Sequence, residues 1–275
     1  MAHQLVVVGT GIQVGHLTAE AKGWLSCADK VLYCVADAAT ERMIVSLNKN
    51  SESMFKFYGE KKNRRETYQQ MIDRTIECLR EAETLCVAYY GHPGFFVYPS
   101  HKAIALAREM GFGARMLPGV SSLDCLLCDL GIEAAVGLQV YEATDFMLRR
   151  RKPDTSTHIV VFQVSALGDL SYSFDGYDLR HLPSLAEHLL DFYPPDFVVK
   201  AYHAPHFPVA EHVVVEMALE ELARCSSSLI STIYIPPFRT APVHLDILKQ
   251  YEMDHFLEGV RLIPINADEN THFSK

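Results

Sequence analysis

Short apolar runs rich in β-branched residues alternate with segments of helical periodicity through the first half of the chain, and this alternation constrains the fold more than any other feature. The runs LVVVG, KVLYCVA, TLCVAYY and ARMLP have the composition of buried strands. Helical patterns lie between them at residues 17–28, 39–47, 65–82 and 100–110. Such alternation favours a mostly parallel sheet covered by helices.

The pattern restarts after DLGIEA with LQVYEA, HIVVFQV, a helical pattern at 182–192, FVVKAYH, VVVEMALEELA and STIYIPP. This half is richer in β signals and alternates less regularly. We therefore predict two α/β domains, an N-terminal one over residues 1–130 and a C-terminal, mixed one over 131–265, followed by a loose tail at 266–275. The stretch GDLSYSFDGYDL is expected to be a surface loop.

Composition excludes several classes of protein. The net charge of −9 argues against a nucleic-acid-binding surface. No apolar run approaches the ~20 residues of a membrane span, and no signal peptide precedes the first predicted strand, so we expect a cytoplasmic protein. Seven cysteines suit a reducing compartment. We predict no metal site, because Cys125 and Cys128 form an isolated C-x-x-C that is better explained as two small core residues on one helical face.

A glycine loop follows the first predicted strand in LVVVGTGIQVGHLT. Its third glycine comes one residue too late for the G-x-G-x-x-G pattern of dinucleotide-binding folds, and the Gly-Lys-Ser/Thr of a phosphate-binding P-loop is missing. Thr18 and Glu20 mark the start of the next helix. The loop is therefore expected to border a cleft without gripping a phosphate.

Four blocks in order make the chain resemble the tetrapyrrole methylase superfamily. They are VVVGTGIQVGHLTAEAKGWLSCADKVLY, YGHPGFF, LPGVSS and STIYIPP. The resemblance implies a two-domain α/β fold with the cofactor cleft between the domains. It also implies S-adenosylmethionine as cofactor, methyl transfer, and a homodimer.

Two departures from the tetrapyrrole enzymes resemble the borosin group, which methylates backbone amides of ribosomally made peptides. His92 stands where the superfamily usually has an aspartate, and Gln163 where it usually has a methionine. The borosin group also carries a tyrosine, an arginine and a second tyrosine after its first helices. Tyr58, Arg64 and Tyr68 have the matching spacing, with Arg65 as a rival for the arginine.

The chemistry of amide methylation explains why such residues would be needed. An amide nitrogen is a poor nucleophile, so its proton must be removed while charge on the carbonyl oxygen is stabilised. A nearby guanidinium lowers the pKa of a phenol, and Arg64 and Tyr68 share one helical face at i, i+4. Tyr58 and Tyr90 are predicted to donate hydrogen bonds to the oxygen. From spacing alone, Tyr68 equally suits the start of an apolar helix face.

The resemblance also implies a set of cofactor-binding residues. They are Tyr90, His92, Phe95, Val97, Ser122, Gln163, Tyr202, Ser231 and Thr232. All lie at predicted strand ends or turns, where open α/β sheets bind ligands. The aromatic residues that follow His92 are otherwise taken mainly as packing.

Some borosin enzymes carry their substrate peptide as a C-terminal extension, whereas this sequence has no apolar peptide after STIYIPP. We therefore predict a methyltransferase that acts on a separate precursor peptide. The alternative is a C-methyltransferase of tetrapyrrole or corrin-type small molecules, which the four blocks support equally well but the tyrosine and arginine set does not.

Overall fold

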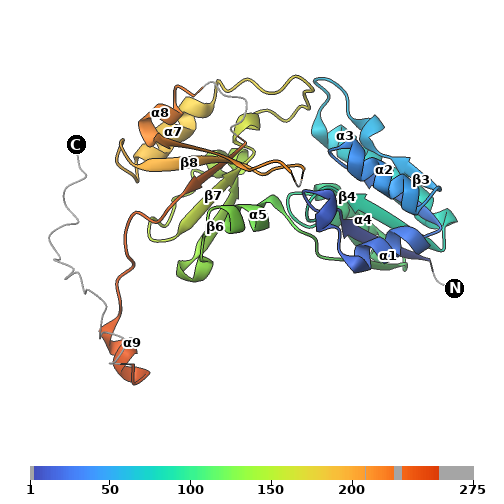
Figure 1. Ribbon diagram of the computed structural model, residues 1–275, viewed down its shortest axis with the longest axis horizontal. Coiled ribbons are helices and arrows are strands. Elements are labelled where there is room, and N and C mark those ends of the chain that lie inside the picture. Colours follow the sequence, from blue (N-terminus) through green and yellow to red (C-terminus); the bar gives the residue numbers. More distant parts are fainter. Residues whose placement is uncertain (1–2, 208, 226–230, 254–275) are drawn as a thin grey trace.

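The computed structural model describes residues 3–207, 209–225 and 231–253. The predicted tail at 266–275 lies outside these residues, as does the end of the predicted C-terminal domain. Figure 1 shows two sheets with their helices, one at each side of the molecule, and the short helix α5 in the chain that joins them.

The first sheet is wholly parallel, with strand order β3-β2-β4-β1-β5. Its strands are β1 (Gln4–Gly9), β2 (Lys30–Cys34), β3 (Ser51–Ser53), β4 (Thr84–Tyr89) and β5 (Gly113–Met116). The helices are α1 (Ala19–Cys27), α2 (Ala38–Leu47), α3 (Arg64–Glu81) and α4 (Tyr98–Glu109). The predicted helices lie within two residues of these bounds, whereas β3 was missed because its residues, Ser-Glu-Ser, carry no apolar pattern.

Alternation of side chains along β1 builds a core on each face of this sheet. Leu5 and Val7 pack with residues of α3 and α4 in one core, and Val6 and Val8 pack with residues of α1 and α2 in the other. Both faces of the sheet are therefore covered, which is why its strands read as continuous apolar runs.

The second sheet is mixed, with strand order β6-β7-β10-β8-β9. Among the described strands of this sheet, only β6 and β7 pair in parallel. The elements from the joining helix onward are α5 (Ser122–Asp129), β6 (Leu138–Glu142), α6 (Ala143–Leu148), β7 (His158–Phe162), α7 (Leu182–Leu190), β8 (Val198–His203), β9 (Val213–Ala218), α8 (Leu219–Leu222), β10 (Thr232–Ile235) and α9 (Leu245–Gln250). The predicted domain boundary near residue 130 falls between the strands of the two sheets and stays a prediction.

The two faces of the second sheet have different neighbours. Ile159 and Val161 of β7 face a core shared with α6, α7 and α8. Val160 and Phe162 face the other way and pack with Leu126 of α5 and, from the first half of the chain, with Ile12. This second face therefore looks toward the first sheet. No helix among the described residues has the length and apolar character that crossing a membrane requires.

Candidate active site

A cavity of about 470 Å³ lies between the two halves of the chain. All of the residues assigned to the site from the sequence line it: Tyr58, Arg64, Tyr68, Tyr90, His92, Phe95, Val97, Ser122, Gln163, Tyr202, Ser231 and Thr232. Arg65, the rival of Arg64, is exposed and is not among the lining residues. The structure brings the predicted residues together, and their individual roles stay predictions.

The first wall consists of loops at the carboxyl ends of β1 and β4, held together by backbone contact. Gly11 and Gly91 exchange two hydrogen bonds of 3.0 and 3.2 Å, and both have positive φ. A methyl group on Gly9 would lie 2.2 Å from the carbonyl oxygen of Gly91. The glycines are thus needed for the close approach of the two loops. That the loop does not bind a phosphate stays a prediction.

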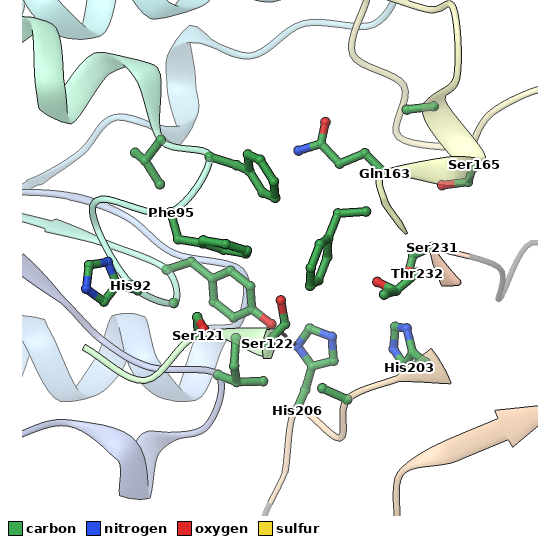
Figure 2. A pocket seen from close by; sticks show the side chains of 18 of the residues that line it. His92, Phe95, Ser121, Ser122, Gln163, Ser165, His203, His206, Ser231 and Thr232 are labelled. Carbon is green, nitrogen blue, oxygen red and sulfur yellow. Dashed lines mark hydrogen bonds between the residues drawn. The ribbon is translucent and has the colours of Figure 1, made fainter. Parts of the chain in front are cut away.

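Tyr90 and His92 differ in what they offer to the cavity. Tyr90 stacks at 5.8 Å against His206, and burial raises the pKa of its hydroxyl, so it remains a hydrogen-bond donor at neutral pH. The Nδ1 of His92 accepts a hydrogen bond of 2.9 Å from the backbone N–H of Gly94. In Figure 2, His92 lies at the margin of the lining side chains, so one nitrogen of its ring stabilises the turn rather than the centre of the site.

The second wall comes from neighbouring strands of the second sheet. Thr232 of β10 pairs with Phe162 of β7 on one side and with Tyr202 of β8 on the other. The hydroxyl of Tyr202 donates a hydrogen bond of 2.5 Å to Asp129, so the residue offers its ring to the cavity while its hydroxyl is already used. Gln163 follows β7 with φ of 59°, in the left-handed region.

Gln163 and Phe96 are both non-glycine residues with positive φ, and they line the cavity from opposite walls. A left-handed backbone conformation costs free energy in a non-glycine residue, and residues in this conformation are often found at ligand-binding sites. Figure 2 shows Gln163 extending from the second wall toward the side of Phe95. The strain is consistent with a site whose side chains are held in place before a ligand arrives.

The predicted tyrosine and arginine set forms one cluster. The side chain of Asn63 caps α3 by accepting a hydrogen bond of 2.9 Å from the backbone N–H of Arg65. This cap makes Arg64 the first residue of the helix and places Tyr68 one turn later on the same face. Tyr58 precedes them at the end of a 3-10 turn, and its phenol acts to raise the pKa of Arg64 and to lower that of Tyr68.

Burial and Arg64 act on Tyr68 in opposite directions. As the sequence predicted, the guanidinium acts to lower the pKa of Tyr68, but burial raises that pKa by more, so the net shift is upward. Burial likewise raises the pKa of Tyr58 well above its usual range. Desolvation outweighs one positive charge here because both phenols are largely removed from water. With these raised pKa values, the phenols of Tyr58 and Tyr68 are protonated hydrogen-bond donors at neutral pH.

Several lining residues were not assigned from the sequence, among them Tyr172, Tyr177, His203 and His206. The two tyrosines belong to GDLSYSFDGYDL, which was taken as a surface loop because of its glycines and polar residues. The two histidines belong to the segment HAPHFPVAEH, in which two prolines break any helical spacing that could have marked them as ligands. Burial and His206 together lower the pKa of His203, so that ring is neutral at physiological pH.

Metal-ligating side chains do not gather in the part of the chain that the structure describes: no group of three or more His, Cys, Asp or Glu residues there could hold an ion. The prediction that Cys125 and Cys128 are both core residues is wrong for Cys128, which is exposed. On the short helix α5 the buried position is Leu126, between them.

The cavity has the features of a small-molecule binding site. Its volume falls in the range of ligand pockets, and its walls combine aromatic rings with a few polar groups. Hydroxyl groups from Ser122 and Thr232 and the amide of Gln163 supply donors and acceptors. Loop backbone at the ends of β1 and β4 supplies more.

The family model described as Tetrapyrrole (Corrin/Porphyrin) Methylases matches residues 4–204. A methyltransferase/ribosomally synthesized cyclic peptide dendrothelin A precursor from Dendrothele bispora is 38% identical over 254 residues, which are 90% of this chain and 61% of that protein. A methyltransferase/ribosomally synthesized type III borosin cyclic peptide precursor from Anomoporia bombycina is 41% identical over 247 residues, 88% of this chain and 29% of that protein. This chain therefore spans less than two thirds of the length of either relative.

Among solved structures, the uroporphyrin-III-C-methyltransferase of Thermus thermophilus matches with a TM-score of 0.61 and 19% identity, over 86% of this chain and 93% of that one. A structure of that enzyme complexed with S-adenosylhomocysteine matches with a TM-score of 0.58 and 17% identity, over 85% of this chain and 92% of that one. At this identity the likeness concerns the fold, and the predicted two-domain α/β fold is confirmed.

Proposed function

Because this chain belongs to the tetrapyrrole methylase family, a family of S-adenosylmethionine-dependent methyltransferases, we propose that it methylates backbone amide nitrogens of a peptide. The observation that carries the proposal is the cluster of Tyr58, Arg64 and Tyr68 in the same cavity as the proposed cofactor residues. The relatives named as methyltransferases joined to ribosomally synthesized cyclic peptide precursors support a peptide as the substrate.

S-adenosylmethionine, when bound, supplies an electrophilic methyl group on a positively charged sulfonium. Residues of both walls are proposed to hold it. The rings of Tyr90 and Phe95 offer apolar faces, and Ser122, Gln163 and Thr232 offer hydrogen bonds. The aromatic walls also keep water from the reacting atoms.

The peptide is proposed to place one amide beside Tyr68. Its phenolate takes the amide proton, and the charge that builds on the carbonyl oxygen faces Arg64 and the phenol of Tyr58. Because burial raises the pKa of Tyr68, its deprotonation requires positive charge nearby. Arg64 supplies one such charge, and a sulfonium in the cavity would act in the same direction.

The precursor is predicted to be a separate protein, and the enzyme a homodimer. Both remain predictions: the relatives join enzyme and precursor in one chain, and the structure describes a single chain. Sedimentation analysis of the purified protein tests the predicted homodimer, and a measured mass equal to that of one chain would contradict it.

The experiment for the activity incubates the purified chain with S-adenosylmethionine and a panel of candidate precursor peptides. Tandem mass spectrometry then locates mass increments of one methyl group on the backbone, with reactions lacking cofactor as the control. Methylation of backbone amides is the expected result. Peptides that stay unmodified while uroporphyrinogen-type substrates gain methyl groups on carbon would contradict the proposal and favour the small-molecule alternative, which the fold likeness supports.

A further inference from the structure

The loop at residues 168–179, here called the clasp loop, leaves the second half of the chain and pairs with the first. The backbone N–H of Lys61 donates to the carbonyl oxygen of Tyr172 at 2.8 Å, and that of Tyr172 donates back to Lys62 at 3.0 Å. The N–H of Arg64 donates to Leu170 at 2.9 Å. The clasp loop thus satisfies a backbone donor at the first residue of α3, which a helix N-terminus would otherwise leave to water.

Side chains reinforce this pairing. The ring centroids of Tyr58 and Tyr172 lie 4.4 Å apart. The carboxylate of Glu60 accepts hydrogen bonds from the backbone N–H of Phe174 at 2.8 Å and from the hydroxyl of Ser173 at 3.1 Å. Contacts on both sides of Tyr172 therefore fix where the next part of the clasp loop, with Tyr177, lies relative to Arg64.

Arg64 meets Tyr177 at this point. Its Nη2 donates a hydrogen bond of 2.5 Å to the hydroxyl of Tyr177, and its Cζ lies 5.2 Å from the centroid of that ring. None of the ion pairs formed among the described residues involves Arg64, although it is only partly exposed. Its electrostatic neighbours include three phenols, those of Tyr177, Tyr68 and Tyr58. The carboxylate of Asp169 in the clasp loop also interacts with the guanidinium, but forms no ion pair with it.

A neutral acceptor differs from a carboxylate in what it does to a guanidinium. A carboxylate would orient the group but also neutralise its charge, whereas a phenol orients it and leaves the charge available to other groups. In the cavity that charge faces Tyr68 and Tyr58.

We propose that Tyr177 is a positioning residue that holds the Arg64 guanidinium against the reacting amide, so that the second half of the chain completes the catalytic cluster of the first. This inference rests on the proposed function for its kinetic consequence. The contact itself, in which the hydroxyl of Tyr177 holds the Arg64 guanidinium, can be tested without measuring enzyme activity.

The first test compares Tyr177→Phe with Tyr193→Phe. Tyr193 is buried in the core behind the second sheet, and its hydroxyl has no hydrogen-bond partner among the described residues, so its loss is a matched control. Phenylglyoxal labelling followed by peptide mass spectrometry measures the reactivity of Arg64. We expect it to rise roughly tenfold in Tyr177→Phe, the factor for losing a hydrogen bond to a charged group, and to stay unchanged in Tyr193→Phe. Unchanged reactivity in Tyr177→Phe overturns the proposal.

The second test is kinetic. Tyr177→Phe is expected to lower kcat about tenfold or more, while the KM for peptide and the affinity for S-adenosylhomocysteine stay within about twofold. An unchanged kcat, or a loss confined to KM and cofactor affinity, overturns the proposal. Tyr177→Leu serves in its place if melting curves show that Tyr177→Phe does not fold. A wild-type chain that methylates no peptide would contradict the proposed function alone, and the labelling result would still decide the role of Tyr177.

Discussion

Tyr68 combines three properties at the scale of a single residue: it lines the cavity, it is largely buried, and it lies one helical turn from Arg64. Tyr68→Phe keeps the ring and removes only the proposed proton acceptor. We expect methyl transfer to fall by about 10²–10⁴-fold, the usual contribution of a general base. S-adenosylhomocysteine affinity, measured by calorimetry, should stay unchanged. Turnover equal to wild type would remove the proposed role.

The raised pKa of Tyr68 also predicts how activity depends on pH. Because the phenolate is the active form of a base and burial disfavours it, kcat should increase with pH from neutral into the alkaline range. Arg64→Gln removes the positive charge that acts to lower the pKa of Tyr68. The pH range over which kcat increases should therefore move to higher pH by about one unit or more. A pH profile of kcat for both proteins is the measurement, and a profile already level at neutral pH would contradict the assignment.

At the scale of elements, the close approach of the β1 and β4 loops depends on Gly9. A methyl group there would lie 2.2 Å from the Gly91 oxygen and 2.7 Å from Cδ of Pro93. Gly9→Ala should therefore destabilise the protein by about 2–4 kcal/mol in urea unfolding. Gly23→Ala is the control, because the residue is inside α1 and, apart from its chain neighbours and its own helix backbone, no atom of the described residues lies within 4 Å of the added carbon. It should stabilise the helix by about 0.5–1 kcal/mol. Equal effects at the two positions would contradict the close-approach argument.

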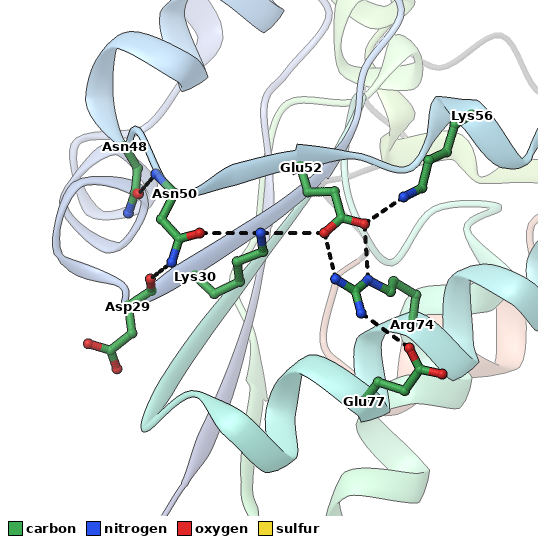
Figure 3. Close-up of polar contacts among 8 residues, drawn as sticks. All are labelled: Asp29, Lys30, Asn48, Asn50, Glu52, Lys56, Arg74 and Glu77. Atoms are coloured by element: carbon green, nitrogen blue, oxygen red, sulfur yellow. Dashed lines mark hydrogen bonds and ion pairs between the residues drawn. The ribbon is translucent and has the colours of Figure 1, made fainter.

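The polar edge strand β3 is held by charge rather than by apolar packing. Figure 3 shows Glu52 at the centre of a network with Lys30, Lys56 and Arg74. Arg74 donates two hydrogen bonds to its carboxylate, of 2.7 and 3.0 Å. These bonds lower the pKa of Glu52 to about 2, with Lys56 adding to the effect and burial opposing it.

This lowered pKa predicts a pH-dependent share of stability. The contribution is present above the unfolded-state pKa and is lost as pH falls from about 4.5 to about 2. Glu52→Gln should cost about 1–2 kcal/mol at pH 7, and the variant and wild type should converge near the lower pH. Glu77→Gln is the control, since Glu77 pairs with the same Arg74 at an exposed position and should cost less than about 0.5 kcal/mol. A constant difference between Glu52→Gln and wild type across this range would contradict the prediction.

At the scale of the whole molecule, the cavity takes residues from both halves of the chain, so a ligand in it stabilises both. S-adenosylhomocysteine at about 100 times its Kd should add about 2.7 kcal/mol and raise the Tm by about 5 °C. Gln163→Ala should reduce this shift. Gln139→Ala should not, because Gln139 lies outside the cavity and bonds to Thr157. A wild-type shift that Gln163→Ala leaves unchanged would contradict the assignment of this cavity as the cofactor site.

The sequence by itself determined the fold class, the family and part of the set of residues around the cavity. Local patterns suffice for these, because strand and helix periods and the order of short motifs are properties of neighbouring residues. The same locality explains the errors: β3 has no apolar period, and the polar segment 168–179 resembles any surface loop.

Only the tertiary structure decided how those residues act on one another. Pairing of the clasp loop with residues 61–64, separated from it by more than a hundred positions, brings Tyr177 to Arg64. Burial of the tyrosine cluster raises the pKa of Tyr68 and outweighs the lowering by Arg64 that the sequence predicted. Desolvation depends on everything packed around a group, and no spacing along the chain contains that quantity.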